Sequence, residues 1–352
     1  MKKLSKNENI NLSIEKARGI TCFCVCAIHF GFEGILGEKI HAILMYAVPF
    51  FFIVSGYFVY DSDLVVFQKK LKQRIKKYTI IYMKAAVIYS LLSILDWKLK
   101  YGNFIGIVDW LKRTSIFEII VDNTWPFELG GPIWYISALV YTYIILYFLC
   151  KNRLVELCLP LSIFFLFINS VFTELYGIWG DELLFTGNFF TRGIPFVFLG
   201  VVIKRNVSSV VRISNITCVM FIILGIVLPV LELSFLDRLG ILVYQGYFVG
   251  NFFMAIGLFV LCIKYPFVSG KDLLFWLGNT FSFGIYLVHQ PIGELINEWL
   301  VIRLHIEWFW GNFKAFTVFV ISFLLLFFYK LVCVYIAFYK GKNKISGEND
   351  AK

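Results

Sequence analysis

His29 and Arg18 are the two residues of this 352-residue chain whose types and spacing most suggest chemistry. Both lie in the first of many apolar segments, where an ionisable side chain facing lipid costs roughly 2.5–3.5 kcal/mol, so we expect them to face a protein-lined cavity. Eleven residues of helix rise about 16 Å and bring both side chains within about 20° of one face. The pair could therefore line one path at two depths, with the imidazole accepting a proton near neutral pH.

The elements that must position this pair are membrane-spanning helices. The chain is 59% apolar and 16% charged, and its mean hydropathy is +0.78, far above that of soluble domains. Apolar runs of roughly 17 to 25 residues can cross a bilayer. We predict an all-α integral membrane protein, a bundle of about ten transmembrane helices near residues 17–36, 41–60, 79–96, 133–150, 155–172, 189–203, 213–231, 242–263, 273–291 and 313–337.

Lysine and arginine gather in alternate segments between these runs, and this sets the expected orientation. Short cytoplasmic loops retain positive charge, and the basic segments are Lys2/Lys3/Lys6, residues 69–77, Lys151/Arg153, Lys204/Arg205/Arg212, Lys264/Lys271 and Lys340/Lys342/Lys344. The opposite segments carry most of the acidic residues. We expect both termini in the cytoplasm and one multi-pass domain over residues 1–352, with tails at 1–16 and 338–352. The expected location is a cell membrane, most simply a bacterial cytoplasmic membrane.

The charge and the cysteines argue against two other classes of protein. The net charge of +10 is spread over the predicted cytoplasmic loops, which suits an anionic bilayer surface and not a nucleic acid. Among the eight cysteines, Cys22, Cys24 and Cys26 are spaced by two, which scatters thiols around a helix. We interpret all eight as packing residues and predict no metal site. The oligomeric state is left open.

Four sequence stretches, in order along the chain, carry a family resemblance. They are residues 15–20 with His29 and 47–57, the basic stretch ending at 74–77, residues 131–139, and residues 281–291. Together they resemble the acyltransferase 3 family of membrane-bound O-acyltransferases. Two residues depart from the family pattern, because Lys77 stands where a second arginine is usual and Pro132 stands where many members have histidine. A lysine keeps the positive charge and loses the bidentate guanidinium fork.

The resemblance implies that an acyl group, commonly acetyl, passes from cytoplasmic acetyl-CoA or another acyl-CoA to a hydroxyl of an envelope glycan, a lipid-linked sugar or a wall polymer. On this basis Arg74, Lys76 and Lys77 would meet the donor phosphates. Arg18 would lie on the donor path, and His29 would be the general base or would carry the acyl group itself. The candidates for oxyanion or acceptor contacts are Ser55, Tyr135, Ser137 and His289.

Each candidate also has a purely structural explanation. An intramembrane histidine such as His29 is often an interhelical contact, and His289 could cap a span at the membrane interface. Arg18 could extend to the cytoplasmic interface, and the basic stretch could reflect topology alone. Ser55 and Gly56 could form a notch for close helix packing.

Two other functions stay open. Residues 131–141 and 191–196 are similar to the membrane domain of the two-domain vancomycin-resistance serine racemases, of the same superfamily, which suggests a transporter of a small amino acid such as serine. Inverted-repeat transporters carry broken helices at equivalent places in two halves, and the sequence has no such symmetry. The third function is an accessory protein that flips or tethers a glycan precursor and would tolerate loss of His29. Acceptor choice is expected in outer loops such as 97–132 and 173–188.

Overall fold

The computed structural model describes residues 10–102, 131–179, 188–240, 248–267, 270–301 and 304–349. Within these ranges the chain is helical and contains no strand, as the sequence predicts. Most of the predicted acceptor loop 97–132 and half of the loop 173–188 lie outside the described residues. The helices in chain order are α1 (Leu12–His29), α2 (Gly34–Leu44), α3 (Ala47–Val59), α4 (Leu64–Tyr101), α7 (Ile133–Lys151), η2 (Val155–Leu157), α8 (Cys158–Trp179), η4 (Phe189–Gly193), α9 (Ile194–Arg205), α10 (Val207–Val210), α11 (Asn215–Arg238), α12 (Val249–Lys264), α13 (Leu273–Trp276), η5 (Leu277–Phe281), α14 (Ser282–Ile296), η6 (Asn297–Val301) and α16 (Glu307–Asn349).

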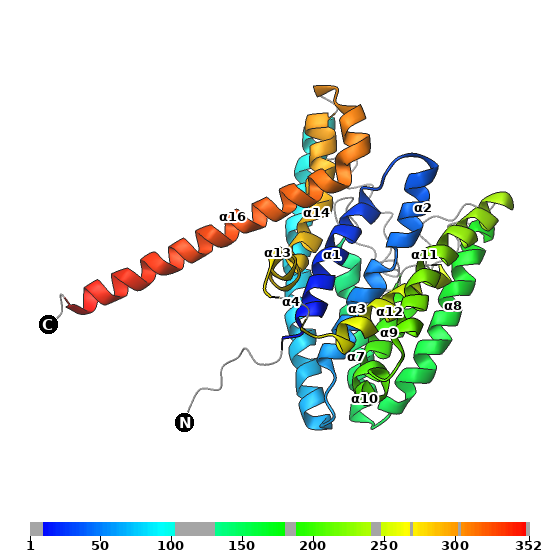
Figure 1. Ribbon diagram of the computed structural model, residues 1–352. Helices are drawn as coiled ribbons and strands as arrows, with labels where there is room; N and C mark the ends of the chain where they lie inside the picture. The colour runs from blue at the N-terminus through cyan, green and yellow to red at the C-terminus, as the bar shows by residue number, and fades with distance from the viewer. Residues whose placement is uncertain are drawn as a thin grey trace.

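Helix α1 lies in the middle of the bundle and contacts elements from both halves of the chain (Figure 1). It packs against α2, α3 and α12, and also against α13, η5, α14 and α16. The neighbouring pairs α3–α9, α4–α7, α8–α9 and α11–α12 complete the bundle. The main apolar core lies between these helices, and its largest fully buried side chains include Phe50, Phe52, Tyr143, Phe196 and Phe259. Arg18 of α1 is therefore held between helices, whereas His29 is exposed at the end of the same helix.

Five helical segments of the described chain are long and apolar enough to cross a membrane by length and composition. They are Gly34–Val59, Leu64–Tyr101, Ile133–Lys151, Asn215–Arg238 and Phe309–Phe338. Two more of the predicted spans fall on shorter apolar helices, Val155–Ser170 and Val249–Lys264. The all-helical membrane class is thus found, while the number of ten spans stays a prediction.

The basic stretch 69–77 is not a loop, and here the sequence-based prediction was wrong. It lies inside α4, a single helix of 38 residues that also contains the predicted span 79–96. The Asp63 carboxylate caps the helix by accepting from Val65 N at 2.8 Å, and Gly102 ends it in the left-handed region at φ 70°. Lysine, arginine and glutamine are good helix formers, and no glycine or proline interrupts the run. A high positive charge therefore does not stop this helix.

Several of the segments that carry basic residues lie at one end of the bundle. The start of α4, the end of α7 and α10 all lie at that end (Figure 1). Arg205 Nη2 is 2.5 Å from Glu156 Oε1, and Lys264 donates to the carbonyl oxygen of Ile213. At the opposite end, Lys100 pairs with Asp96 and Glu298. These helix ends agree with the sidedness inferred from charge, and the assignment of the basic end to the cytoplasm stays a prediction.

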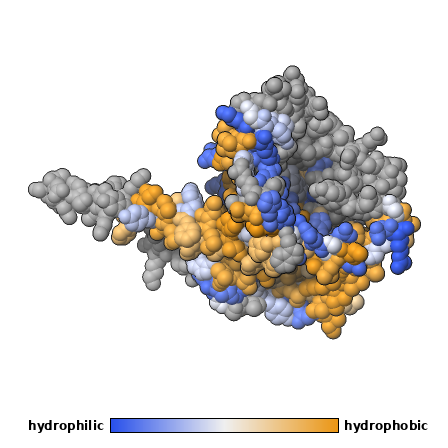
Figure 2. All heavy atoms as spheres, turned by 90° about the horizontal axis from the view of Figure 1, so that it is seen from above, coloured by the Kyte–Doolittle hydropathy of each residue, from blue (hydrophilic) through white to orange (hydrophobic). Residues whose placement is uncertain are grey.

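The last helix, α16, leaves the bundle and runs outward (Figure 1). From above, apolar side chains gather along α16 and along one side of the bundle, and hydrophilic side chains cross the middle of the same face (Figure 2). Phe316, Leu325 and Phe328 are among the exposed apolar residues of α16, which suits contact with lipid. Seven of the eight cysteines are buried and unbridged, as expected of packing residues, but Cys333 on α16 is exposed.

Candidate functional site

The first candidates are both carried by α1. The Asn11 side chain accepts a hydrogen bond from Ile14 N at 3.0 Å, which caps the start of the helix. The helix then continues without glycine-induced breaks to His29, and Phe30 follows as its C-cap. Arg18 lies in its second turn and His29 at its last residue, so one rigid element holds the two side chains at different depths.

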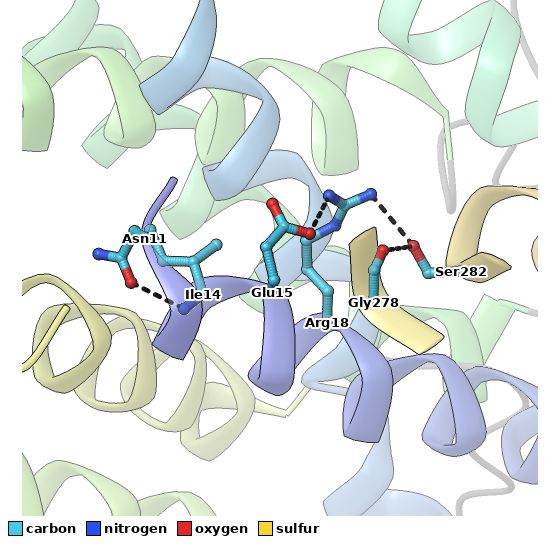
Figure 3. A network of polar contacts seen from close by, with 6 residues as sticks. All are labelled: Asn11, Ile14, Glu15, Arg18, Gly278 and Ser282. Carbon is cyan, nitrogen blue, oxygen red and sulfur yellow. Dashed lines mark hydrogen bonds and ion pairs between the residues drawn. The ribbon is translucent and has the colours of Figure 1, made fainter. Parts of the chain in front are cut away.

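The Arg18 guanidinium joins α1 to the start of α14 (Figure 3). Its Nη1 donates to Glu15 Oε2 at 2.7 Å, and its Nη2 donates to Ser282 Oγ at 3.1 Å. Ser282 in turn donates to the carbonyl oxygen of Gly278 at 2.6 Å. The Glu15 side chain is only 10% exposed, so its charge depends on this pairing. Arg18 therefore points between helices and does not extend outward to the interface.

Two glycines allow this close approach of α1 and η5. A Cβ atom on Gly278 would lie 1.6 Å from the carbonyl oxygen of Glu15, and one on Gly19 would lie 2.5 Å from that of Leu274. Only glycine lets two backbones come so near. The five-residue π-helical turn η5 then leads into α14 and places Ser282 opposite Arg18.

A cavity of about 330 Å³ opens beside Arg18. Residues from α1, α3, α4, α7 and α14 line it, and its polar lining consists of Glu15, Arg18, Ser55, Arg74, Tyr78, Tyr135, Tyr143, Ser282 and Tyr286. Four of the nine candidates from the sequence, Arg18, Ser55, Arg74 and Tyr135, therefore share one cavity. Two guanidinium groups face one carboxylate there, which gives the cavity an excess of positive charge and several hydroxyl donors.

Ser55 lines the cavity, and its neighbour Gly56 forms a close helix contact. Gly56 packs against α9, where an added Cβ would lie 2.0 Å from the carbonyl oxygen of Val197. The Ser55 hydroxyl lies 3.3 Å from the Tyr135 hydroxyl, and Tyr143 donates to the Ser55 carbonyl oxygen at 3.3 Å. The packing notch thus brings three hydrogen-bonding side chains to the cavity wall.

The three basic candidates on α4 differ in whether they line the cavity. Arg74 is half-buried and lines the cavity, whereas Lys76 and Lys77 are exposed and do not line it. The Lys77 ammonium lies 5.8 Å from the centre of the Tyr78 ring. The lysine that replaces the usual second arginine therefore lies outside the cavity, close to its Tyr78 wall.

The two histidine candidates, 260 residues apart in the chain, meet at the far end of α1. Neither lines the cavity. The ring centres of His29 and His289 are 5.1 Å apart, and the Tyr286 ring is centred 5.9 Å from that of His289. Tyr286 also lines the cavity, and its hydroxyl donates to the carbonyl oxygen of Pro132. Tyr286 therefore stands between the cavity and the histidine pair.

The proline in α14 explains part of this arrangement. Pro291 has no N–H, so the carbonyl oxygen of Leu287 one turn earlier lacks its helical partner. The Tyr89 hydroxyl from α4 donates to that oxygen. The stretch 281–291 is therefore fastened to α4 beside the histidine pair.

Ser137 is a candidate that does not lie at the cavity. It is buried, does not line the cavity, and donates to the carbonyl oxygen of Trp134 within its own helix at 2.9 Å. Pro132, the second departure from the family pattern, is the N-cap of the same helix.

Across the described residues no group of histidine, cysteine and carboxylate side chains could hold a metal ion.

Sequence reasoning missed several lining residues and one buried arginine. Glu15, Tyr78, Tyr143, Ser282 and Tyr286 all line the cavity. The spacing of Glu15 and Arg18, one helical turn apart, could have indicated their ion pair. Arg192 of η4 is 9% exposed, and its guanidinium lies 5.2 Å from the Trp134 ring. It stands in the stretch 191–196 that the sequence already singled out.

A family model described as an acyltransferase domain matches residues 11–337 of the chain. Comparison with curated proteins and with solved structures finds no match.

Proposed function

Since the chain belongs to this acyltransferase domain family, it is a membrane acyltransferase, and we propose that it moves an acyl group, in the simplest case acetyl, from acyl-CoA to a hydroxyl of an envelope glycan, a lipid-linked sugar or a wall polymer. The donor would enter from the basic end of the bundle, which we assign to the cytoplasm. The acceptor would approach from the opposite end.

The cavity is the observation that carries this proposal. It joins Arg18 of α1 and Arg74 of α4, which make it attractive to phosphate or to the polar amides of a pantetheine arm. Its volume of about 330 Å³ is at the lower end of the range for small-molecule sites. It suits the thioester end of the donor, and the nucleotide would lie outside, near the exposed Lys76 and Lys77.

The distance between the cavity and His29 sets a requirement for the donor. The α1 residues that line the cavity run from Glu15 to Val25, and His29 lies four residues, about 6 Å of rise, beyond Val25. The acyl end would therefore leave the cavity beside Tyr286 to reach His29. A flexible pantetheine arm is long enough for this passage, which makes acyl-CoA a more suitable donor than a short thioester.

Two routes for the transfer fit His29. In direct transfer, the imidazole takes the hydroxyl proton, the oxygen attacks the thioester carbonyl carbon, the C–S bond breaks, and the thiolate takes the proton back. In the relay, the unprotonated His29 nitrogen attacks the thioester carbonyl carbon, the C–S bond breaks and CoA leaves as the thiolate. The acceptor hydroxyl then attacks the acyl-imidazolium, the C–N bond breaks to free His29, and the hydroxyl proton passes to the thiolate. Ser55 and Tyr135, which line the cavity, would donate hydrogen bonds to the donor carbonyl on its way through.

Transport of a small amino acid such as serine is the second candidate. One observation favours it, because Glu15 and the two guanidinium groups of the cavity would match the amino and carboxylate ends of a zwitterion. Glu15 is already paired with Arg18 at 2.7 Å, so binding of the amino group would have to displace that ion pair. This cost makes transport the weaker proposal.

The test measures release of CoA from acetyl-CoA by the purified protein in lipid with cell-envelope acceptor. The variants are His29→Asn and, as a matched control, His305→Asn, which changes an exposed histidine at φ 53°, a region that asparagine tolerates. We expect release by the wild type and by His305→Asn, and a loss of about 100-fold or more in His29→Asn. No release by any of them, together with serine uptake into proteoliposomes, would replace this proposal by transport.

A further inference from the structure

The two histidines differ in their access to substrate. His29 is exposed at the end of α1, whereas His289 in α14 is fully buried, with 0% of its surface exposed. Their ring centres are 5.1 Å apart. A substrate can reach His29 in this arrangement, and His289 lies behind it.

Backbone contacts fix which His289 nitrogen carries the hydrogen. Its Nδ1 is 2.7 Å from the carbonyl oxygen of Tyr286 and 3.1 Å from that of Ile285. Carbonyl oxygens only accept, so Nδ1 must be the donor. In the neutral ring the other nitrogen, Nε2, is then a hydrogen-bond acceptor with a lone pair.

This acceptor nitrogen is buried and has no hydrogen-bond partner among the described residues. Buried polar atoms in proteins are nearly always bonded, so an orphaned one needs a reason. The His29 ring is the neighbour that can supply a donor. Two imidazoles joined by an N–H···N bond have ring centres roughly 5 Å apart, which is the separation found here. The planes are tilted by 49°, so rotation of the His29 ring about its side-chain bonds can complete the bond.

We propose that His289 is a positioning residue of the acyl-transfer site, whose Nε2 accepts a hydrogen bond from a ring N–H of His29. The inference rests on the proposed function. The bond holds His29 in one tautomer and turns the lone pair of its second nitrogen toward the substrate, whichever of the two routes it serves. The arrangement is that of other activated catalytic groups, in which one side chain reacts with the substrate and a second side chain behind it orients the first.

Backbone carbonyls take the place that a carboxylate has in a catalytic triad. They anchor His289 from behind without adding a charged group, so a membrane-embedded site avoids burying a carboxylate. The role differs from the acceptor or oxyanion contact that the sequence suggested. A fully buried ring in the described structure acts through His29 and does not touch the acceptor itself.

Two substitutions of His289 separate this role from simple packing. The side-chain amide of His289→Asn can replace Nδ1–H as the donor to the backbone but offers nothing at the Nε2 position. The longer side chain of His289→Gln can place its carbonyl oxygen near that position and accept from His29. A structural role depends on the Nδ1 contacts, so it would tolerate the asparagine at least as well as the glutamine.

The measurement is a kcat and KM comparison for CoA release by wild type, His289→Asn and His289→Gln, with melting temperatures taken in the same lipid mixture. We expect kcat to fall about 100-fold in His289→Asn, the usual cost of a misplaced catalytic group, with an unchanged KM for acetyl-CoA. His289→Gln should stay within about tenfold of wild type. A wild-type kcat in His289→Asn, or equal losses in both variants, would overturn the proposal.

A spectroscopic measurement remains decisive if the asparagine variant does not fold. The chain contains four histidines, so ¹⁵N spectra of histidine-labelled wild type in lipid can resolve the ring nitrogens. We expect hydrogen on Nδ1 of His289 and an N–H···N signal shared with His29. Hydrogen on Nε2 of His289 would refute the proposal. This result does not depend on activity, so it is separate from a failure of the proposed function, which absence of CoA release by the wild type would show.

Discussion

Replacing Gly278 by alanine tests whether the contact of α1 and η5 sets the donor site. The added Cβ would lie 1.6 Å from the carbonyl oxygen of Glu15. Ordinary contacts of this kind begin above 3 Å, so the two elements must separate by roughly 1.5 Å or more, and neither atom is the end of a flexible side chain. The same shift would pull Arg18 away from Ser282, whose contact is 3.1 Å long in the native packing.

The magnitude follows from two separate costs. Overpacking of this kind lowers the free energy of unfolding by about 1–3 kcal/mol. A displacement of about 1 Å in a positioned group can lower the rate about 100-fold. We therefore expect Gly278→Ala to lower the melting temperature by several degrees and kcat/KM for CoA release by about two orders of magnitude.

The control is the same substitution where space exists. A Cβ on Gly31 would meet its nearest atom, the carbonyl oxygen of Ala27, at an ordinary 3.6 Å. Gly31→Ala should stay within about twofold of wild type in both rate and stability. If Gly278→Ala behaved like Gly31→Ala, the close α1–η5 contact would not be what positions Arg18, and the description of the site would have to change.

Two further predictions concern α4. Arg74→Ala should raise the KM for acetyl-CoA about tenfold or more, because a guanidinium in the cavity is lost. Lys77→Ala should change this KM by about twofold or less, because the lysine ammonium is exposed. Equal effects of the two variants in steady-state assays would contradict this difference between the residues. Tyr89→Phe should lower the free energy of unfolding by about 1–3 kcal/mol, because it leaves the Leu287 carbonyl oxygen without a donor. An unchanged melting temperature would show that this hydroxyl does not fasten α14.

The sequence predicted the membrane class and the site residues that charge makes conspicuous. Arg18 could be singled out because a charge in an apolar segment needs a reason, and Arg74 because the family resemblance pointed to it; both do line the cavity. The prediction was weaker where it ignored helical phase. Lys76 lies about 200° around the helix from Arg74, so it faces away once the stretch 69–77 is known to be helical. Charge had suggested a loop, in which no such phase applies.

The same reasoning removes Ser137 from the site. Ser137 follows Tyr135 by two residues, about 200° around α7, so the two side chains cannot both face one cavity. The structure places Tyr135 on the cavity and leaves Ser137 bonded within its own helix. The position of His29 was likewise a matter of geometry, because it lies one helical turn beyond Val25, the last residue of α1 that lines the cavity.

One sequence could not show that α1 and α14 pack against each other, although the spacing of residues in α14 did indicate which of them share a helix face. Ser282, Tyr286 and His289 are spaced i, i+4 and i+7, which puts them on one face of a helix, and all three are buried. Ser282 contacts Arg18 at one end of this face, and His289 contacts His29 at the other. Two levels of α1 are therefore matched by two levels of α14, with Tyr286 between them. If an acyl group travels from the cavity to His29, these paired helix faces are its path, and Tyr286 is the side chain that must move to let it pass.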